Sequence, residues 1–531
     1  MKKAYATGLV VLVLVICVFG PRLHLPGKIP SGQPQWSLRA QWFWDALSAG
    51  ELNKTYLAPH PGLTTMWYAG AAQRLSGEQG QFGQMVAASR ANAIVGGLLI
   101  LAAVWLVRRV LDLDEVEETG AVALAFGLIL ALDPLMILMT GLVGLDGVVS
   151  LFMLVGFLLM ALHMRTGSLS SLVAAGLGTG LAVATKVPGL LLLPMPLLWL
   201  GAGPRRQEHW PWVLLLLAVL IVGAALVTWV LLPAAWTNPL DIAKDLLLGQ
   251  KAKDESLREV VASGHLQFFM GRSVRRPGPL FYPVQLLFRI TPVVLVGACL
   301  GLLVPGFRKN RLAREATLGL LLIFIGLTVT GKKTWRYISP AIPLFDLLGT
   351  LGLWFVLRYL AARWRRPATV ALIWVVIAIQ GVWVLNAAPY YLLRLNPIMG
   401  GPRIAQRVIP MGWGEGLEQV LEYLESEAKR LNRVVRWSGG YGAHPRKRKA
   451  LEYESEWLEW KGRSTKPSRV DCHVYYIAEE QRGLSKLKPA DKSWKSRGIE
   501  VLRVVEQGVE LARVRCHSDL GFRPVREEGA G

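Results

Sequence analysis

The sequence is poor in charged residues and in cysteine. Asp, Glu, Lys and Arg make up only 18% of the 531 residues, whereas hydrophobic residues make up 53%. A soluble domain usually carries about 25% charge, so this balance excludes a disordered chain and a small disulfide-rich scaffold and indicates a polytopic membrane protein. The four cysteines show no metal-ligand spacing, and Cys17 and Cys299 fall in apolar segments where core packing is the simplest role.

Acidic residues are scarce relative to basic ones. There are 37 Asp and Glu against 59 Lys and Arg, which gives a formal net charge of +22. Such an excess is typical of proteins that meet nucleic acid, anionic lipid or an anionic substrate. Because the positive charges are spread over separate loops between apolar runs and form no known nucleic-acid-binding module, we exclude nucleic acid as a partner and expect membrane lipid or an anionic substrate.

Apolar runs of roughly spanning length predict about eleven transmembrane helices. The first run follows Lys2 and Lys3 and has the shape of a signal peptide, but without a small-residue cleavage site we interpret it as a retained helix. Three prolines interrupt the run at 188–201. The runs lie near 4–20, 84–107, 120–139, 142–162, 170–187, 188–201, 211–232, 283–305, 315–330, 338–360 and 368–387.

The positive-inside rule orients these helices. With Lys2 and Lys3 in the cytoplasm, the basic residues in the segments 108–109, 165, 205–206, 308–314 and 358–366 all fall on the cytoplasmic side. The transmembrane part then covers residues 1–388, with external loops at 21–83 and 233–282. A Pro- and Gly-rich linker at 389–410 leads to a final segment, 411–531, outside the membrane.

The final segment, 411–531, predicts a small extracytoplasmic α/β domain. It contains an amphipathic helix near 415–430 and strand-like runs near 434–437, 473–477, 501–505 and 509–514, the last two joined by a hairpin at Gln507 and Gly508. Cys472 and Cys516 both fall in this domain. They could pair in an oxidising compartment, and two free thiols are the equally open alternative.

A basic segment between two late spans is the most informative one for chemistry. Lys332, Lys333 and Arg336 stand in a short loop that the topology places outside, against the positive-inside bias. We interpret them as an anion site beside the bilayer, since Arg offers a planar fork to phosphate oxygens and Lys a point charge. A topology shifted by one span, with the segment as cytoplasmic anchor, is the alternative.

Other ionisable residues fall at the same outer face. Asp146 lies about one turn inside its span, where an ionisable group is costly and marks a functional site by default. Lys186 is expected to pair with Asp146 or to bind phosphate, and a purely structural ion pair is equally compatible. His60, between two prolines, could donate to a phosphate or accept a proton, or be structural. Arg272 adds positive charge in the second external loop.

Several short motifs, in family order up to about residue 420, resemble one group of enzymes. The chain is similar to the bacterial GT-C glycosyltransferases of the protein mannosyltransferase and aminoarabinose transferase type. The matching pieces are Trp36-x-x-Arg39 with Ala46-Leu47-x-x-Gly50, His60-Pro61-Gly62-x-Thr64-Thr65-Met66-Trp67, Asp133-Pro134 with Asp146, Thr185-Lys186-x-Pro188, Pro277-Gly278-Pro279-x-Phe281-Tyr282-Pro283, Lys332-Lys333-x-x-Arg336-Tyr337-x-x-Pro340 and Gly412-Trp413-Gly414-Glu415-Gly416.

The resemblance implies an activity and a location. It implies inverting transfer of a sugar from a polyprenyl- or dolichyl-phosphate carrier to an extracytoplasmic acceptor, which is a protein, lipid or glycan. The active site is expected on the outer face of a multi-pass protein of the bacterial inner membrane, and a divalent metal ion stays open as a cofactor. The candidate catalytic residues are Asp146, His60 and Asp45, and the candidate substrate-binding residues are Lys332, Lys333, Arg336, Tyr337, Lys186, Arg272, Trp36 and Arg39.

One departure from the family pattern bears on activity. Members usually carry an acidic residue just before the first-loop tryptophan, whereas this chain has Gly32 or Gln33 there, before Trp36. Glutamine cannot act as a carboxylate base. Either a nearby acid, Asp45 or Glu51, has taken the role, or the protein is a catalytically impaired relative that binds lipid-linked sugar or scaffolds a cell-envelope complex.

Overall fold

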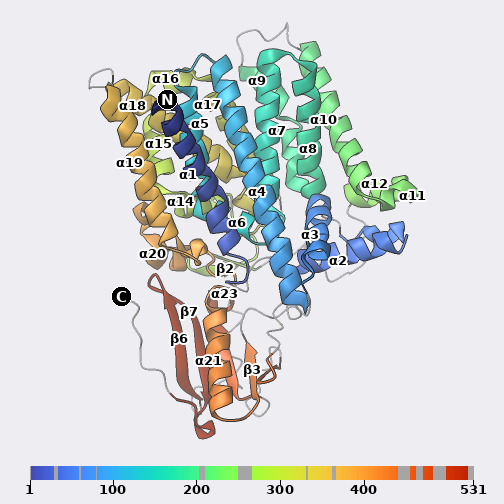
Figure 1. The fold of residues 1–531 in the computed structure, drawn as a ribbon, viewed down its shortest axis with the longest axis vertical. Coiled ribbons are helices and arrows are strands. Elements are labelled where there is room, and N and C mark those ends of the chain that lie inside the picture. The colour runs from blue at the N-terminus through green and yellow to red at the C-terminus, as the bar shows by residue number, and fades with distance from the viewer. Residues whose placement is uncertain are drawn as a thin grey trace.

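The computed structural model consists of a helical bundle with a small sheet domain at one end of it (Figure 1). The structure describes residues 2–28, 34–58, 61–78, 80–202, 210–248, 266–330, 333–361, 366–439, 455–461, 470–481 and 498–523. His60, Lys332, Gly32 and Gln33, which the sequence singles out, lie outside these ranges.

The first half of the bundle runs from the N-terminus to residue 248. The short helices of residues 34–48 and 63–76 lie toward the end of the bundle that carries the sheet domain (Figure 1). The elements are α1 (Lys2–His24), α2 (Pro34–Ser48), η1 (Leu52–Thr55), α3 (Leu63–Ser76), α4 (Gly80–Leu113), α5 (Thr119–Ala131), α6 (Pro134–Gly141), α7 (Asp146–Thr166), α8 (Leu169–Thr185), η2 (Val187–Leu192), α9 (Met195–Ala202), α10 (Trp210–Leu231), α11 (Ala234–Thr237) and α12 (Pro239–Leu248).

The second half of the bundle starts with a short hairpin and ends in the linker. The elements are β1 (Gln267–Phe269), β2 (Arg272–Val274), α14 (Phe281–Arg289), α15 (Pro292–Gly301), α16 (Pro305–Lys309), α17 (Arg311–Val329), η3 (Trp335–Ile338), α18 (Ala341–Ala361), α19 (Arg366–Leu385), η4 (Tyr391–Leu393), η5 (Pro397–Met399) and α20 (Gly401–Val408).

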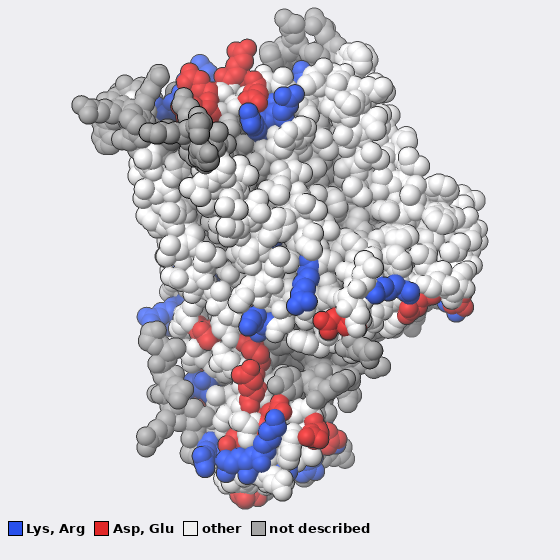
Figure 2. Space-filling model, in the orientation of Figure 1, with Lys and Arg blue, Asp and Glu red and all other residues white. Residues whose placement is uncertain are grey.

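The length and composition of the helices make this a multi-pass membrane protein. Among the described residues, five helices are long and apolar enough to cross a membrane, and two bent pairs raise that number to seven. Four shorter apolar helices accompany them, so the predicted number of eleven spans stays a prediction. The visible face of the bundle carries a broad uncharged belt, with charged side chains gathered at its two ends (Figure 2), as a lipid-facing surface requires.

Two of the predicted spans are broken rather than straight. The run 120–139 bends by 66° between α5 and α6, and the run 283–305 bends by 113° between α14 and α15. At the first break Pro134 has no N–H to continue the helix, and the Asp133 carboxylate instead caps α6 by accepting a hydrogen bond from Met136 N at 2.8 Å. Pro292 likewise occupies the first position of α15, but Thr291 before it makes no capping hydrogen bond with its side chain.

Within the described residues, the sheet domain has five strands in the order β4-β3-β5-β7-β6. Strand β3 runs parallel to β4 and β5, whereas β7 runs antiparallel to β5 and β6. The predicted hairpin is confirmed, and Gln507 and Gly508 both have positive φ, as a tight two-residue turn demands. The elements are α21 (Leu417–Arg430), β3 (Val435–Gly439), β4 (Leu458–Trp460), β5 (Cys472–Tyr476), α23 (Ile477–Gln481), β6 (Gly498–Glu506), β7 (Val509–His517) and η8 (Ser518–Leu520).

The open question about the cysteines of this domain is decided by strand register. Cys472 on β5 and Cys516 on β7 face each other as direct partners with Cα atoms 4.1 Å apart, and they form a disulfide. Both are fully buried. Cys17 and Cys299 are free.

Removing this disulfide is expected to destabilise the sheet domain. Replacing both Cys472 and Cys516 by alanine releases a loop of 44 residues in the unfolded chain, and such a loss costs about 2–5 kcal/mol. Calorimetry of the detergent-solubilised chain should show an earlier transition for the double variant. Cys299→Ala, at an exposed free thiol, is the matched control and should leave that transition unchanged. An unshifted transition in the double variant would contradict this account.

A buried histidine makes the same domain sensitive to acid. His473 on β5 is 6% exposed, its Nδ1 lies 2.8 Å from Ser438 Oγ, and burial lowers its pKa to about 4. In the unfolded chain its pKa is about 6.5, so below that pH the unfolded state binds the proton more readily than the folded state. The domain should therefore lose up to about 3 kcal/mol as pH falls from about 6.5 to about 4.

The measurement is calorimetry of the full chain at a series of pH values, with His473→Gln beside the wild type. Carboxylates contribute to acid unfolding as well, since the side-chain hydrogen bond from Arg430 lowers the pKa of Glu427. Only the difference between the two proteins reports on His473. If the stability of the two proteins falls in parallel as the pH is lowered, His473 does not contribute to the acid sensitivity of the domain.

Candidate functional site

The N-terminus of α7 is held in place by helix α4. Asn92 Nδ2 donates to the carbonyl oxygens of Thr140 and Leu142, each at 2.9 Å, and Ser89 Oγ accepts a hydrogen bond from Val143 N at 3.0 Å. These contacts fix the loop between α6 and α7, and therefore the position of Asp146 at the start of α7. A carboxylate there is stabilised by the helix dipole.

Close backbone packing makes a glycine necessary beside Asp146. A Cβ at position 147 would lie 2.5 Å from the backbone carbonyl carbon and oxygen of Met139. Gly147 therefore lets the end of α6 cross directly over the first turn of α7. This crossing buries Asp146, whose side chain is only 3% exposed.

Lys186 stands at the C-terminus of α8. Pro188 ends the helix here, and Lys186 takes an extended conformation as its C-cap, where a positive charge is favourable. The beginning of α3 docks against this helix end. Gly62 N donates to the carbonyl of Thr185 at 3.0 Å, and the hydroxyls of Thr64 and Thr185 are 2.7 Å apart.

The basic segment after α17 reaches the same place. Arg336 and Tyr337 lie on the short helix η3, and Ser339 Oγ donates to the Asp146 carbonyl at 3.1 Å. Lys186 Nζ donates to Asp146 Oδ1 and lies 4.4 Å from the centre of the Tyr337 ring. Arg336 Nε is 3.9 Å from Asp146 Oδ2. We name Asp146, Lys186, Arg336 and Tyr337 the Asp146 cluster.

The charges of the Asp146 cluster do not cancel. One carboxylate faces one ammonium and one guanidinium, so a positive charge remains. Arg336 is also the most accessible of the three, with a side chain 27% exposed against 7% for Lys186 and 3% for Asp146. A partly exposed guanidinium beside a buried ion pair is suited to bind an anion such as a phosphate.

An arginine that the sequence analysis did not select supports this helix. Arg289, at the end of α14, is 3% exposed, its guanidinium carbon lies 4.5 Å from the Trp335 ring centre, and its Nη2 donates to the Pro410 carbonyl at 3.1 Å. Trp335 also packs edge-to-face on Trp413, at 5.8 Å between ring centres. The Gly412–Gly416 motif thus contacts η3. The sequence feature that could have identified Arg289 is its position inside an apolar run.

Other candidate residues have different surroundings. Lys333 Nζ donates to the carbonyls of Leu327, Thr328 and Thr330 at 3.2, 2.6 and 3.4 Å, so it caps the end of α17. Trp36 is 3% exposed, and Arg39 stacks on its ring at 4.5 Å. Arg272 is exposed on β2.

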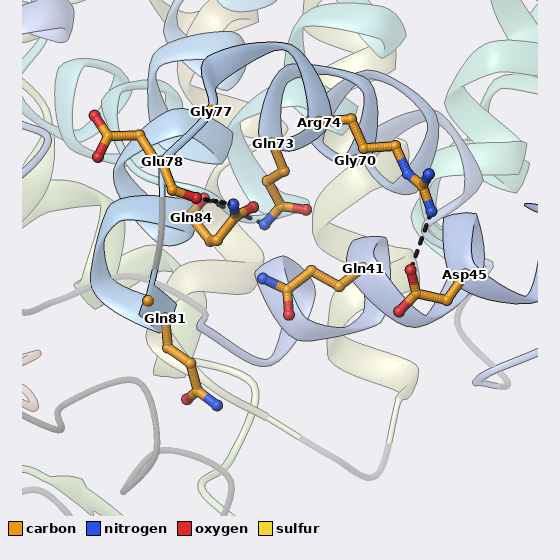
Figure 3. A pocket seen from close by; sticks show the side chains of 10 residues that line it. Gln41, Asp45, Gly70, Gln73, Arg74, Gly77, Glu78, Gln81 and Gln84 are labelled. Carbon is orange, nitrogen blue, oxygen red and sulfur yellow. Dashed lines mark hydrogen bonds and ion pairs between the residues drawn. The ribbon is translucent and has the colours of Figure 1, made fainter.

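Asp45 lies on α2 in an open groove rather than in the contacts that define the Asp146 cluster. Its Oδ1 accepts a hydrogen bond from Arg74 Nη2 at 3.0 Å, and its side chain is 70% exposed (Figure 3). The groove lies between α2, α3 and the start of α4.

The donor set described by the structure does not suit a divalent metal ion. Among the described residues, no group of three or more His, Cys, Asp and Glu side chains could hold one. Asp146, the carboxylate of the cluster, already faces Lys186 and Arg336, and two cations repel a third. We therefore assign no metal-binding role to Asp146.

The fold is shared with solved membrane enzymes. The oligosaccharyltransferase of Archaeoglobus fulgidus in the apo form has a TM-score of 0.52 and 13% identity, with 99% of this chain and 75% of that one covered. Archaeal oligosaccharyltransferase AglB from Archaeoglobus fulgidus, in complex with an inhibitory peptide and a dolichol-phosphate, has a TM-score of 0.50 and 13% identity, with 98% and 75% covered.

A third similar structure is ArnT from Cupriavidus metallidurans bound to undecaprenyl phosphate. Its TM-score is 0.49 at 15% identity, with 97% of this chain and 98% of that one covered. No protein-family model and no curated protein matches the sequence. At these identities the two Archaeoglobus fulgidus structures establish the fold alone, and it agrees with the fold that the sequence motifs imply.

Proposed function

Because the chain has the fold of the GT-C membrane glycosyltransferases, we propose that it moves a sugar from a polyprenyl-phosphate carrier to an extracytoplasmic acceptor, with inversion at the anomeric carbon. The observation that carries the proposal is the Asp146 cluster, in which three motifs far apart in sequence meet around Asp146 with an excess positive charge. A protein of this fold has been solved with dolichol-phosphate, which supports a lipid phosphate as the anion here.

Arg336 and Lys186 have the chemistry that a departing lipid phosphate needs. Negative charge grows on the phosphate as the sugar leaves, and preorganised cations in a poorly solvated site stabilise it. Arg336 is the more exposed of the two and is positioned to contact phosphate oxygens directly, whereas the buried Lys186 contributes its positive charge from a greater depth. Tyr337 restricts the Lys186 ammonium through the contact with its ring.

Asp146 acts in this proposal as a positioning residue for both cations. The Asp146 carboxylate is already engaged by Lys186 and Arg336, and taking a proton from an acceptor would disrupt these ion pairs, so it is a poor base. The base for the acceptor is therefore a different group. His60 stays a candidate, because the chain from Gly62 onward is bound to the end of α8 that carries Lys186.

The proposal places the protein in the bacterial inner membrane with the Asp146 cluster and the sheet domain outside the cytoplasm. The external loops and the sheet domain lie at one end of the bundle, which supports a shared side (Figure 1). Thr334 is half-buried in the segment before η3 and suits a cysteine label. Labelling of Thr334→Cys by a membrane-impermeant maleimide in intact spheroplasts supports the orientation, and labelling only after lysis contradicts it.

A catalytically impaired relative is the second candidate function. Gly32 and Gln33 stand where an acidic residue is expected, and the Asp45 carboxylate accepts a hydrogen bond from Arg74. Purified protein with polyprenyl-phosphate-linked sugars distinguishes the two candidates. Release of polyprenyl phosphate supports the transferase. Saturable binding of the donor without release supports the impaired relative, especially if Gln33→Glu or Gly32→Asp then yields turnover.

A further inference from the structure

The interior of the bundle holds three ionisable side chains that the proposed transfer does not use. Arg22 on α1, Asp133 between α5 and α6, and Asp346 on α18 are each 0% exposed. The Arg22 guanidinium interacts electrostatically with the Asp133 carboxylate, and the charge of Asp133 acts in turn on Asp346. We name these three residues the Asp346 cluster. Burying such groups inside a membrane bundle is costly, so each needs a compensating interaction.

Two members of the Asp346 cluster have partners that stabilise their charge. Arg22 donates from Nε to Thr140 Oγ1 at 2.8 Å and from Nη1 to the Ala131 carbonyl at 2.9 Å. Asp133 caps α6, where the helix dipole stabilises a carboxylate, and it has Arg22 as its counter-ion. Asp133 is therefore the ionised acid of the cluster.

Asp346 has no comparable support. Neither of its carboxyl oxygens has a hydrogen-bond partner among the described residues, and Oδ2 of Asp133 likewise lacks one. Of the titratable groups in the described part of the chain, the one whose charge acts on Asp346 is Asp133, and that charge disfavours a second carboxylate. An ionised carboxylate without a partner is too costly to bury, so such a group takes up a proton instead.

We infer that the Asp346 cluster is a proton-binding site, in which Asp346 carries one proton and is a neutral carboxylic acid. One guanidinium and two carboxyl groups are electrically neutral only if one of the acids is protonated. Cys17 and Tyr391, the other titratable groups that act on Arg22, are uncharged near neutral pH and do not change this balance. A metal ion fits less well, because the cluster offers three unused carboxyl oxygens and hard metal ions take about six oxygen ligands.

The position of the site gives the proton a role. Asp133 stands before α6, which leads to the loop before Asp146, and Asp346 lies on α18, which follows the helix η3 that carries Arg336. The two segments that meet at the Asp146 cluster therefore meet a second time, where α18 packs on α5. A proton on Asp346 removes the repulsion between two carboxylates at this second contact. The inference goes beyond the proposed transfer and does not depend on it.

Infrared spectroscopy of the detergent-solubilised full chain at neutral pH tests the inference, because a protonated carboxyl group has a C=O band distinct from that of a carboxylate. We expect the difference spectrum between the wild type and Asp346→Asn to show the loss of one protonated-carboxyl band. Other protonated acids cancel in this difference. Asp45→Asn, at an exposed carboxylate paired with Arg74, is the matched control and should lose carboxylate absorption only.

Thermal unfolding of the same variants separates a neutral Asp346 from an ionised one. Asparagine matches the shape and the charge of a neutral aspartic acid, so Asp346→Asn should unfold at nearly the same temperature as the wild type. Asp133→Asn keeps a capping side chain but leaves the Arg22 guanidinium without its counter-ion, and it should unfold several degrees earlier.

Three results would overturn the inference. They are a protonated-carboxyl band that Asp346→Asn retains in full, a loss of thermal stability in Asp346→Asn as large as in Asp133→Asn, and a sodium-dependent stabilisation of the wild type, at constant ionic strength, that Asp346→Asn abolishes. None of these measurements uses a sugar donor, so a failure here is distinct from a failure of the proposed transfer.

Discussion

Replacing Arg336 by alanine is expected to lower the rate of sugar transfer by about 100-fold to 1000-fold, the usual cost of removing one group that stabilises transition-state charge. Arg336 is the partly exposed cation of the Asp146 cluster, and no increase in donor concentration replaces a charge needed as the phosphate departs. The measurement is the release of polyprenyl phosphate at saturating donor. Arg336→Lys should recover only part of the rate, because lysine keeps the charge and loses the planar fork.

The matched control for this variant is Arg275→Ala. Arg275 is an exposed arginine between β2 and α14, and its loss removes the same charge from the protein without touching Asp146. It should retain a rate close to that of the wild type. A wild-type rate in Arg336→Ala would remove Arg336 from the proposed mechanism, and an equal loss in both variants would point to a general effect of net charge.

Replacing Asp146 by asparagine is expected to destabilise the bundle by about 3–5 kcal/mol, the range for breaking a buried ion pair by removing one partner. The substitution leaves the Lys186 ammonium, 7% exposed, without its carboxylate and beside the Arg336 guanidinium, which repels it. Equilibrium unfolding in mixed detergent micelles measures the change.

A double substitution tests the electrostatic reason for this loss. Asp146→Asn combined with Lys186→Gln removes both buried charges and should recover most of the lost stability, since the cost comes from the uncompensated ammonium. Glu51→Gln is the control, because it breaks the exposed pair with Lys54, whose partners are 69% and 47% exposed, and exposed pairs contribute about 1 kcal/mol or less. A double variant as unstable as Asp146→Asn would contradict the explanation.

Sequence reasoning identified most of the Asp146 cluster because its members are anomalous one by one. Asp146 and Lys186 are ionisable groups at span ends, and Arg336 stands in a basic loop that the predicted topology places against the positive-inside rule. The expected pairing of Lys186 with Asp146 is present in the structure. The alternative of phosphate binding by Lys186 is compatible with that pair and stays a prediction.

Buried polar residues inside apolar runs or just beyond them were harder to interpret. Arg22 and Asp133 are both fully buried, and Arg22 Nε donates to Thr140 Oγ1 at 2.8 Å while Asp133 caps the broken helix α6. From sequence, residues 120–139 formed one straight span, because hydropathy averages over a window and does not register a single cap followed by proline. Arg289 escaped selection for the same reason.

The sequence by itself determined the membrane character and the residue types available for an anion site, because these depend on composition and local pattern. The side on which each loop lies is a prediction of the positive-inside rule. Tertiary structure decided which of those residues meet. Lys333 donates hydrogen bonds to carbonyls at the end of α17, whereas Arg336, three residues later, contacts Asp146. The difference arises from the path of the backbone through η3. The pairing of Cys472 with Cys516 and the groove between α2, α3 and α4 likewise depend on strand register and helix crossing, which join residues that local pattern leaves unconnected.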